Sequence, residues 1–80
     1  MPRFKDISGK KLVSFFEAQG FLIVDQHGSH IKLRRLISDN KQTLIVPNHT
    51  SIRKGTIHEI YNQALQYIGD EILRDFFHTK

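Results

Sequence analysis

The sequence predicts an α+β fold in which helices cover one face of a three-stranded antiparallel sheet. Apolar residues recur at helical spacing near both ends of the chain, in residues 9–19 and 57–68. Between these segments lie three stretches rich in strand-forming residues, at 21–26, 30–37 and 43–46. A short helical stretch follows at 70–77. This order favours a two-layer sandwich whose second sheet face is open.

Length and composition limit the classes of function. The 80 residues predict a single domain, 1–80, with a core over about 8–68 and a helical extension over 70–77. The chain has no cysteine, so it has neither disulfides nor thiolate metal ligands. No apolar run approaches a membrane span, and the first residues do not resemble a signal peptide. We therefore expect a cytoplasmic protein that does not contact the membrane.

The net charge of +4, from 12 Lys and Arg against 8 Asp and Glu, favours encounters with polyanions such as nucleic acid. The same charge is also common in small domains for solubility alone. The distribution of the cations is therefore more informative than their sum.

The first helix, 9–19, has a recognisable start and end. Ser8 suits the N-cap, and Leu12, Val13 and Phe16 lie on one face at helical spacing. Gly20 suits a left-handed residue at the C-terminal end.

Alternation assigns the strand residues to faces, because successive side chains point to opposite sides. In the first strand, Leu22 and Val24 share one face, and Phe21 and Ile23 share the other. A turn at Gly28 and Ser29 then leads to the second strand. One face of that strand, predicted to lie under the helices, carries Ile31, Leu33, Arg35 and Ile37; the open face carries His30, Lys32, Arg34 and Leu36.

The second half of the chain is predicted to form a turn, a third strand, a loop and two helices. Residues 38–42 have turn chemistry, the third strand ends at Pro47, and residues 47–55 form a loop. Thr56 and Glu59 have the spacing of a capping box at the start of the second helix. The apolar stripe of that helix comprises Ile57, Ile60, Tyr61, Ala64, Leu65 and Ile68, and that of the 70–77 helix comprises Ile72, Leu73, Phe76 and Phe77.

The predicted topology brings two distant segments together. A third strand antiparallel to the second ends near the point where the second begins. The loop that carries His49, Arg53 and Lys54 should therefore emerge close to Gly28, Ser29 and His30.

Such a cluster suits RNA cleavage without a metal. The reaction needs a base for the 2′-hydroxyl proton, an acid for the leaving oxygen and cations for the charge on phosphorus. An imidazole can serve as base or acid near neutral pH. The amides of Gly28 and Ser29 can grip a phosphate oxygen, and the cations that can follow the RNA backbone are Lys32, Arg34, Arg53 and Lys54. In the plainer interpretation, His30 is a surface strand residue and His49 a turn residue.

A metal site is the competing use of five histidines. His27 and His30 are three residues apart, so on one strand they would face opposite sides, and no cysteine or clustered aspartate joins them. We therefore expect no metal and no other cofactor.

Several short motifs follow one another along the chain: Ser8-Gly9-Lys10, the helix to Gly20-Phe21, Gln26-His27-Gly28-Ser29-His30, Val46-Pro47-Asn48-His49 and Lys54-Gly55-Thr56-Ile57. In this order they resemble the HicA-type (YcfA-like) toxins, and the resemblance runs from about Ser8 to Ile68. The Gly-Ser-His triplet, followed by Pro-x-His and a Gly-Thr helix start, is specific as an ordered set, although each piece alone is weak.

The resemblance implies a fold like that of double-stranded-RNA-binding domains and a ribonuclease that cuts mRNA and arrests translation and growth. It implies a HicB antitoxin that masks the active site. It places the catalytic histidine at His30, with Gly28 and Ser29 shaping the site. His49 matches a common position, whereas His27 and the tail 70–80 depart from the shared core.

Two other functions remain open. A non-catalytic RNA-binding module of the same fold would use His30 and the basic row only to hold the backbone. A protein-interaction domain would act through its helices and tail, without the salt-dependent RNA affinity that backbone contacts produce.

Overall fold

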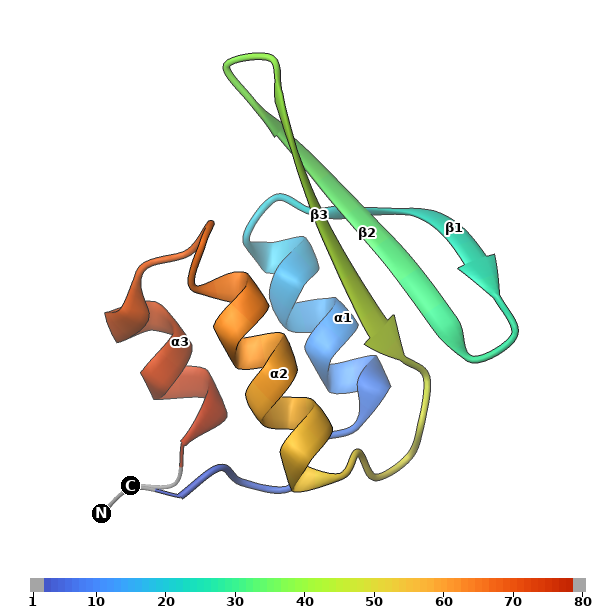
Figure 1. Ribbon diagram of the computed structural model, residues 1–80, viewed down its shortest axis with the longest axis vertical. Coiled ribbons are helices and arrows are strands. Elements are labelled where there is room, and N and C mark those ends of the chain that lie inside the picture. The colour runs from blue at the N-terminus through green and yellow to red at the C-terminus, as the bar shows by residue number, and fades with distance from the viewer. Residues whose placement is uncertain (1–2, 79–80) are drawn as a thin grey trace.

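The computed structural model describes residues 3–78 and confirms the predicted fold class. In chain order the elements are α1 (Gly9–Ala18), β1 (Leu22–His27), β2 (His30–Ile37), β3 (Asn40–Pro47), α2 (Lys54–Ala64) and α3 (Asp70–Phe77). The strands form one antiparallel sheet in the order β1-β2-β3. Figure 1 shows the helices side by side against one face of the sheet, with the β2–β3 hairpin rising beyond them.

The first helix begins and ends as predicted. The Ser8 side chain accepts a hydrogen bond from the backbone N–H of Lys11, at 3.1 Å. Gly20 has a φ of 98°, a conformation that glycine adopts without steric cost. The helix itself ends at Ala18, one residue before the predicted end.

The first strand differs from the prediction because it is an irregular edge strand. It begins at Leu22 and extends to His27, and its register with β2 shifts between Ile23 and Asp25. A bulge of this kind interrupts the alternation of faces after Val24. Leu22 and Val24 still line one shallow pocket together with Arg34 and Leu36 of the open face, as their predicted common face implies. All six residues of β1 are exposed, since the helices cover only the part of the sheet nearer β3.

The third strand is longer than predicted, and the turn before it is shorter. Ser38 and Asp39 have φ values of 49° and 67°, the positive values of a two-residue type I′ hairpin turn. Residues 40–42, predicted as turn, pair with β2 instead. Ile37, predicted to lie under the helices, is 46% exposed because this end of the sheet extends beyond them.

The core lies between the helix layer and the covered face of β2 and β3. Its largest fully buried side chains are Phe16, Phe21, Phe77, Ile7, Leu12, Leu33, Leu44, Ile57, Leu73 and Val46. The helical extension contributes to this core through Leu73 and Phe77, whereas Ile72 of its predicted stripe is exposed.

One cation is on the covered face as predicted, and it joins several segments. The Arg35 guanidinium donates hydrogen bonds to the carbonyl oxygens of Gln19, at 2.7 Å, and Tyr67, at 2.9 Å. Its Nε donates to the Gln42 side chain at 2.8 Å, and its charge lies 4.7 Å from the centre of the Phe21 ring. Arg35 therefore ties the ends of α1 and α2 to the sheet.

The capping box predicted for the second helix is wrong. The helix begins at Lys54, three residues before the start that a Thr56 cap implies, and its N-cap Arg53 makes no side-chain cap hydrogen bond. The helix ends at Ala64, which leaves Leu65 41% exposed and places the buried Ile68 in the following turn. Within residues 3–78, no helix has the length and apolar character needed to cross a membrane.

Candidate functional site

A cleft of about 330 Å³ lies along the seam between β3 and α2. Strand residues His30, Ile45 and Pro47 form one wall. The other residues that line it come from the 48–53 loop and α2: His49, Ile52, Arg53, Thr56, Glu59, Ile60 and Gln63. Residues from the first hairpin, formed by β1 and β2, and from the segment after β3 therefore lie together at this cleft, as the topology predicted.

Backbone contacts hold these two segments together. His30 is the cross-strand partner of Pro47, and the Asn48 N–H donates to the Ser29 carbonyl oxygen at 2.5 Å. On the other side, the N–H of Gly9 donates to the His49 carbonyl oxygen at 2.8 Å. A Cβ atom on Gly9 would lie 2.1 Å from the Pro47 carbonyl oxygen, so only glycine permits this approach of α1.

Three of the predicted site residues line this cleft, and their side chains are available to bind a ligand. His30, His49 and Arg53 are exposed, and none of their side chains makes a hydrogen bond or ion pair within the described part of the chain. Unengaged imidazole and guanidinium groups in one cleft can bind a phosphate and transfer protons beside it.

Glu59, Thr56 and Gln63 also line the cleft, and sequence reasoning missed them as site residues. Thr56 and Glu59 were interpreted as caps, but α2 begins earlier and presents them on one face. The spacing 56, 59 and 63 is the i, i+3, i+7 pattern of a single helix face, and this polar stripe was the available signal.

The turn at Gly28 and Ser29 positions His30. Gly28 has a φ of 57° and Ser29 has no positive φ, the pattern of a type II′ hairpin turn. No atom lies within 4 Å of a Cβ built on Gly28, so the backbone conformation, not a close approach, requires this glycine. Ser29 is half-buried, and its carbonyl oxygen makes the contact to Asn48 described above.

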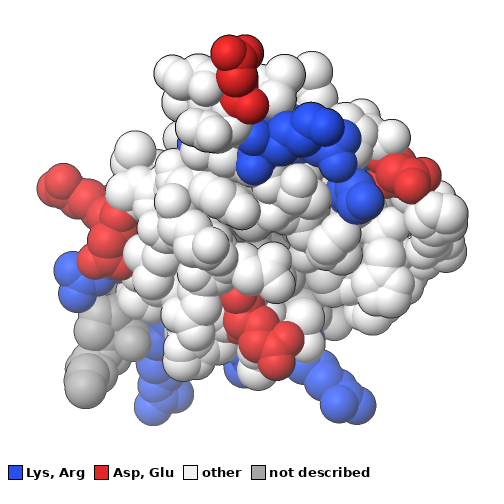
Figure 2. Space-filling model, turned by 45° about the horizontal axis from the view of Figure 1, so that its top comes forward, with Lys and Arg blue, Asp and Glu red and all other residues white. Residues whose placement is uncertain are grey.

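Lys32 and Arg34 lie on the open face of the sheet, in the rows next to His30. Lys32 pairs with Asp25 and Ile45 across the strands, and Arg34 pairs with Leu22 and Thr43. Both are half-buried. Figure 2 shows a continuous patch of Lys and Arg side chains near the protruding end of the sheet, with acidic groups beside it.

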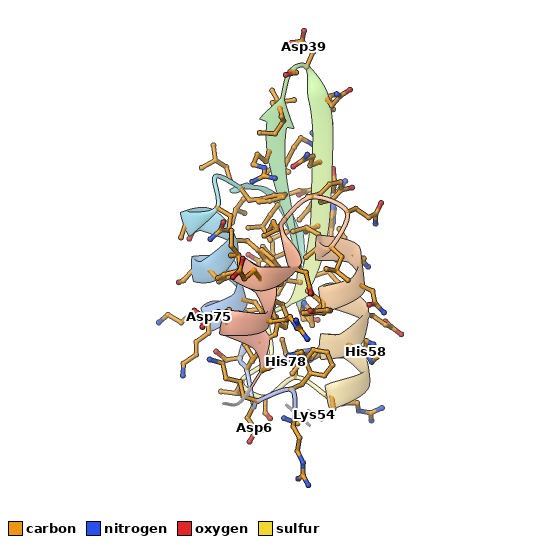
Figure 3. The ribbon with its side chains drawn as sticks, turned by 90° about the vertical axis from the view of Figure 1, so that its left-hand side faces the viewer. Asp6, Asp39, Lys54, His58, Asp75 and His78 are labelled. Carbon is orange, nitrogen blue, oxygen red and sulfur yellow. The ribbon has the colours of Figure 1, made fainter. Side chains whose placement is uncertain are left out.

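Lys54 does not join the cluster in which the topology placed it. Its ammonium donates to the Phe4 carbonyl oxygen at 2.7 Å and lies 2.9 Å from an Asp6 carboxylate oxygen. Figure 3 shows Lys54 and Asp6 together at the end of the molecule opposite Asp39. The reason is that Lys54 is already the first residue of α2, so its side chain reaches the N-terminal segment.

The prediction that His27 and His30 face opposite sides of a strand is wrong. His27 and His30 flank a two-residue turn and are cross-strand partners, so they share a face and do not point to opposite sides. The Nε2 atom of His27 lies 3.0 Å from Asp25 Oδ2. The pKa of Asp25 is lowered, mainly because the backbone N–H of Gln26 donates to its other carboxylate oxygen at 2.8 Å.

Residues 3–78 contain no group of three or more His, Cys, Asp or Glu side chains arranged to hold a metal ion.

The amino-acid sequence that builds this α+β sandwich and its cleft matches one known class of small bacterial proteins. The family described as the HicA toxin of bacterial toxin–antitoxin systems matches residues 9–65, and the chain belongs to this family. Comparisons with curated proteins and with solved structures found no match. As a member of a toxin–antitoxin family, the chain is a toxin, and a cognate antitoxin is its partner in general terms.

Proposed function

We propose that this toxin is a metal-independent endoribonuclease that cleaves mRNA and thereby arrests translation and growth. The observation that carries the proposal is the cleft itself: His30, His49 and Arg53 line it together, with side chains unengaged within the described residues. Membership of the HicA family supports the assignment.

In the proposed mechanism, His30 is the general base or the general acid. The base removes the proton of a ribose 2′-hydroxyl, whose oxygen attacks the adjacent phosphorus. The bond to the 5′-oxygen breaks, and the acid gives that oxygen a proton. The products are a 2′,3′-cyclic phosphate and a 5′-hydroxyl, so no water, metal or co-reactant enters this step.

The remaining residues bind the substrate. Arg53 and His49 face the phosphate from the loop, while Gly28 and Ser29 form the turn that presents His30. Lys32 and Arg34 extend positive charge over the open face, along which a strand of RNA can run. We leave Lys54 outside this set because its ammonium is paired with Asp6.

The partner that silences the toxin is, in this proposal, a HicB-type antitoxin that covers the cleft. Family membership supports an antitoxin. Covering the cleft would block RNA without any change in the toxin's own fold.

The test compares the wild-type chain with His30→Ala on a mixed single-stranded RNA, with and without a chelator. We expect wild-type cleavage that survives chelation and falls by about 100- to 10,000-fold in the variant, the usual contribution of a general acid or base. RNA affinity should largely persist, because most of the binding charge is retained.

Equal cleavage by both proteins would contradict the role of His30. RNA binding by both without cleavage would replace the proposal with a non-catalytic RNA-binding module, a function that the open-face cations Lys32 and Arg34 would also serve.

A further inference from the structure

The first hairpin carries a histidine that the proposed mechanism does not use. His27 and His30 close the two-residue turn as a cross-strand pair. Side chains directly opposite each other in an antiparallel pair have Cβ atoms about 4.5–5.5 Å apart. Two imidazoles on such a frame can place ring nitrogens on either side of one phosphate group.

The His27 ring also has a partner that orients it. Asp25 Oδ2 lies 3.0 Å from Nε2, and the lowered pKa of Asp25 means that its carboxyl is ionised at neutral pH. An ionised carboxylate accepts a hydrogen bond, so Nε2 carries the proton. The Nδ1 atom is then the nitrogen left to exchange a proton with a substrate.

His49 is the other histidine near His30, and it lacks such a partner. Its ring makes no hydrogen bond or ion pair within residues 3–78, and only its backbone carbonyl is tied, to Gly9. Acid–base groups in enzymes are commonly oriented by a third group. By this criterion His27 is better prepared than His49 for a directed proton transfer.

We infer that His27, oriented by Asp25, is the acid–base partner of His30, and that the two histidines take the complementary roles in cleavage of the RNA backbone. This inference rests on the proposed ribonuclease function and deepens it. If His30 takes the 2′-hydroxyl proton, His27 protonates the leaving 5′-oxygen; if the roles are exchanged, the same bonds form and break.

The first experiment measures kcat/KM against pH for wild type, His27→Gln, Asp25→Asn and His49→Gln. The titratable or charged groups that face His27 are Asp25 from its own strand and His30 from β2, with Lys32 beside Asp25. We expect a bell-shaped wild-type profile. His27→Gln should lower kcat/KM by about 100-fold or more and remove one limb of the profile.

The Asp25→Asn variant should keep both limbs with a lower maximum, because the imidazole remains but loses its fixed orientation. His49→Gln should keep both limbs and act mainly through KM, as a binding residue. His58→Gln, at an exposed position on α2 where the ring lies beside Phe4, is the matched control for loss of one imidazole and should change neither parameter. An unchanged profile in His27→Gln, with activity still lost in His30→Ala, would overturn the inference alone.

The second experiment assigns the roles with a ribonucleoside 3′-(aryl phosphate), whose phenolate leaving group needs no proton. Only the variant that lacks the acid should regain near wild-type activity on this ester. We therefore expect one of His27→Gln and His30→Ala to recover and the other to stay impaired. Recovery of both, or of neither, would overturn the pairing. If wild type cleaves neither RNA nor the ester, the proposed function itself fails.

Discussion

The two ends of strand β2 differ in how the rest of the molecule holds them. We call the beginning of β2 the anchored end of the sheet, where residues 28–30 lie beside residues 47–49. The N–H of Gly9 connects this end to α1, and the hydrogen bond between Asn48 and Ser29 joins its two segments. We call the other end of β2 the free end: residues 36–41 are all exposed, and the hairpin rises beyond the helices (Figure 1).

This difference explains where a site can be built. A catalytic group must be held in position, and the anchored end holds His30 and His49 by backbone contacts to a helix and a neighbouring strand. The free end has the same backbone pairing but no layer beneath it. We therefore expect substitutions at the two ends to have unequal effects on stability and activity.

The largest difference in stability should come from two leucines of the same strand. Leu33 is fully buried between β1 and β3, so Leu33→Ala should lower the free energy of unfolding by about 2–5 kcal/mol. Leu36 is 63% exposed at the free end, and Leu36→Ala should change it by less than about 0.5 kcal/mol. Urea unfolding of both variants measures the contrast; equal losses would contradict this account of the free end.

A smaller effect should follow from the contact that anchors the site. In Gly9→Ala the added Cβ meets the Pro47 carbonyl oxygen, so α1 must move away from the end of β3. We expect a loss of about 1–3 kcal/mol in the free energy of unfolding, together with reduced RNA cleavage, because the His49 loop shifts.

The matched control for that variant is Gly55→Ala. Gly55 lies in the first turn of α2, and nothing lies within 4 Å of a Cβ built on it. This change should leave cleavage intact and hold or slightly raise stability. If both glycine variants behave alike, the close approach at Gly9 is not what positions the loop.

The smallest expected effect is a gain at the free end. Ser38 and Asp39 both have positive φ, which their side chains disfavour. Replacing them with Asn and Gly, the residues preferred in a type I′ turn, should raise the midpoint of thermal unfolding by an amount that corresponds to up to about 1 kcal/mol. Cleavage should not change, and a fall in activity would show that the two ends are coupled.

The sequence predicted the order of elements because each one carries its own periodicity. The bounds of β2 and α3 were correct to the residue, since β2 lies between two turns, at Gly28 and at Ser38, and α3 begins directly after Gly69. The errors fell where tertiary contacts override local propensity. Residues 40–42 are weak strand formers that become a strand only through pairing with β2, and the bulge in β1 has no local signature.

The candidate site was likewise predicted only in part. The meeting of His30, His49 and Arg53 followed from strand topology. The pairing of His27 with His30 was missed because alternation was counted along one strand, whereas a two-residue turn folds the chain between them. Glu59 was missed because the start of α2 was set at a favourable capping sequence and not at the true first turn.

The most direct test of the central claim uses two RNA oligonucleotides that differ in a single 2′-hydroxyl, at the site that the toxin cuts. In the presence of a chelator, the wild-type chain should cleave only the ribose form, leave a 2′,3′-cyclic phosphate end, and lose this activity in His30→Ala. Cleavage of the 2′-deoxy form at a comparable rate, or cleavage by the His30→Ala chain, would contradict a histidine-based attack by the 2′-hydroxyl in this cleft.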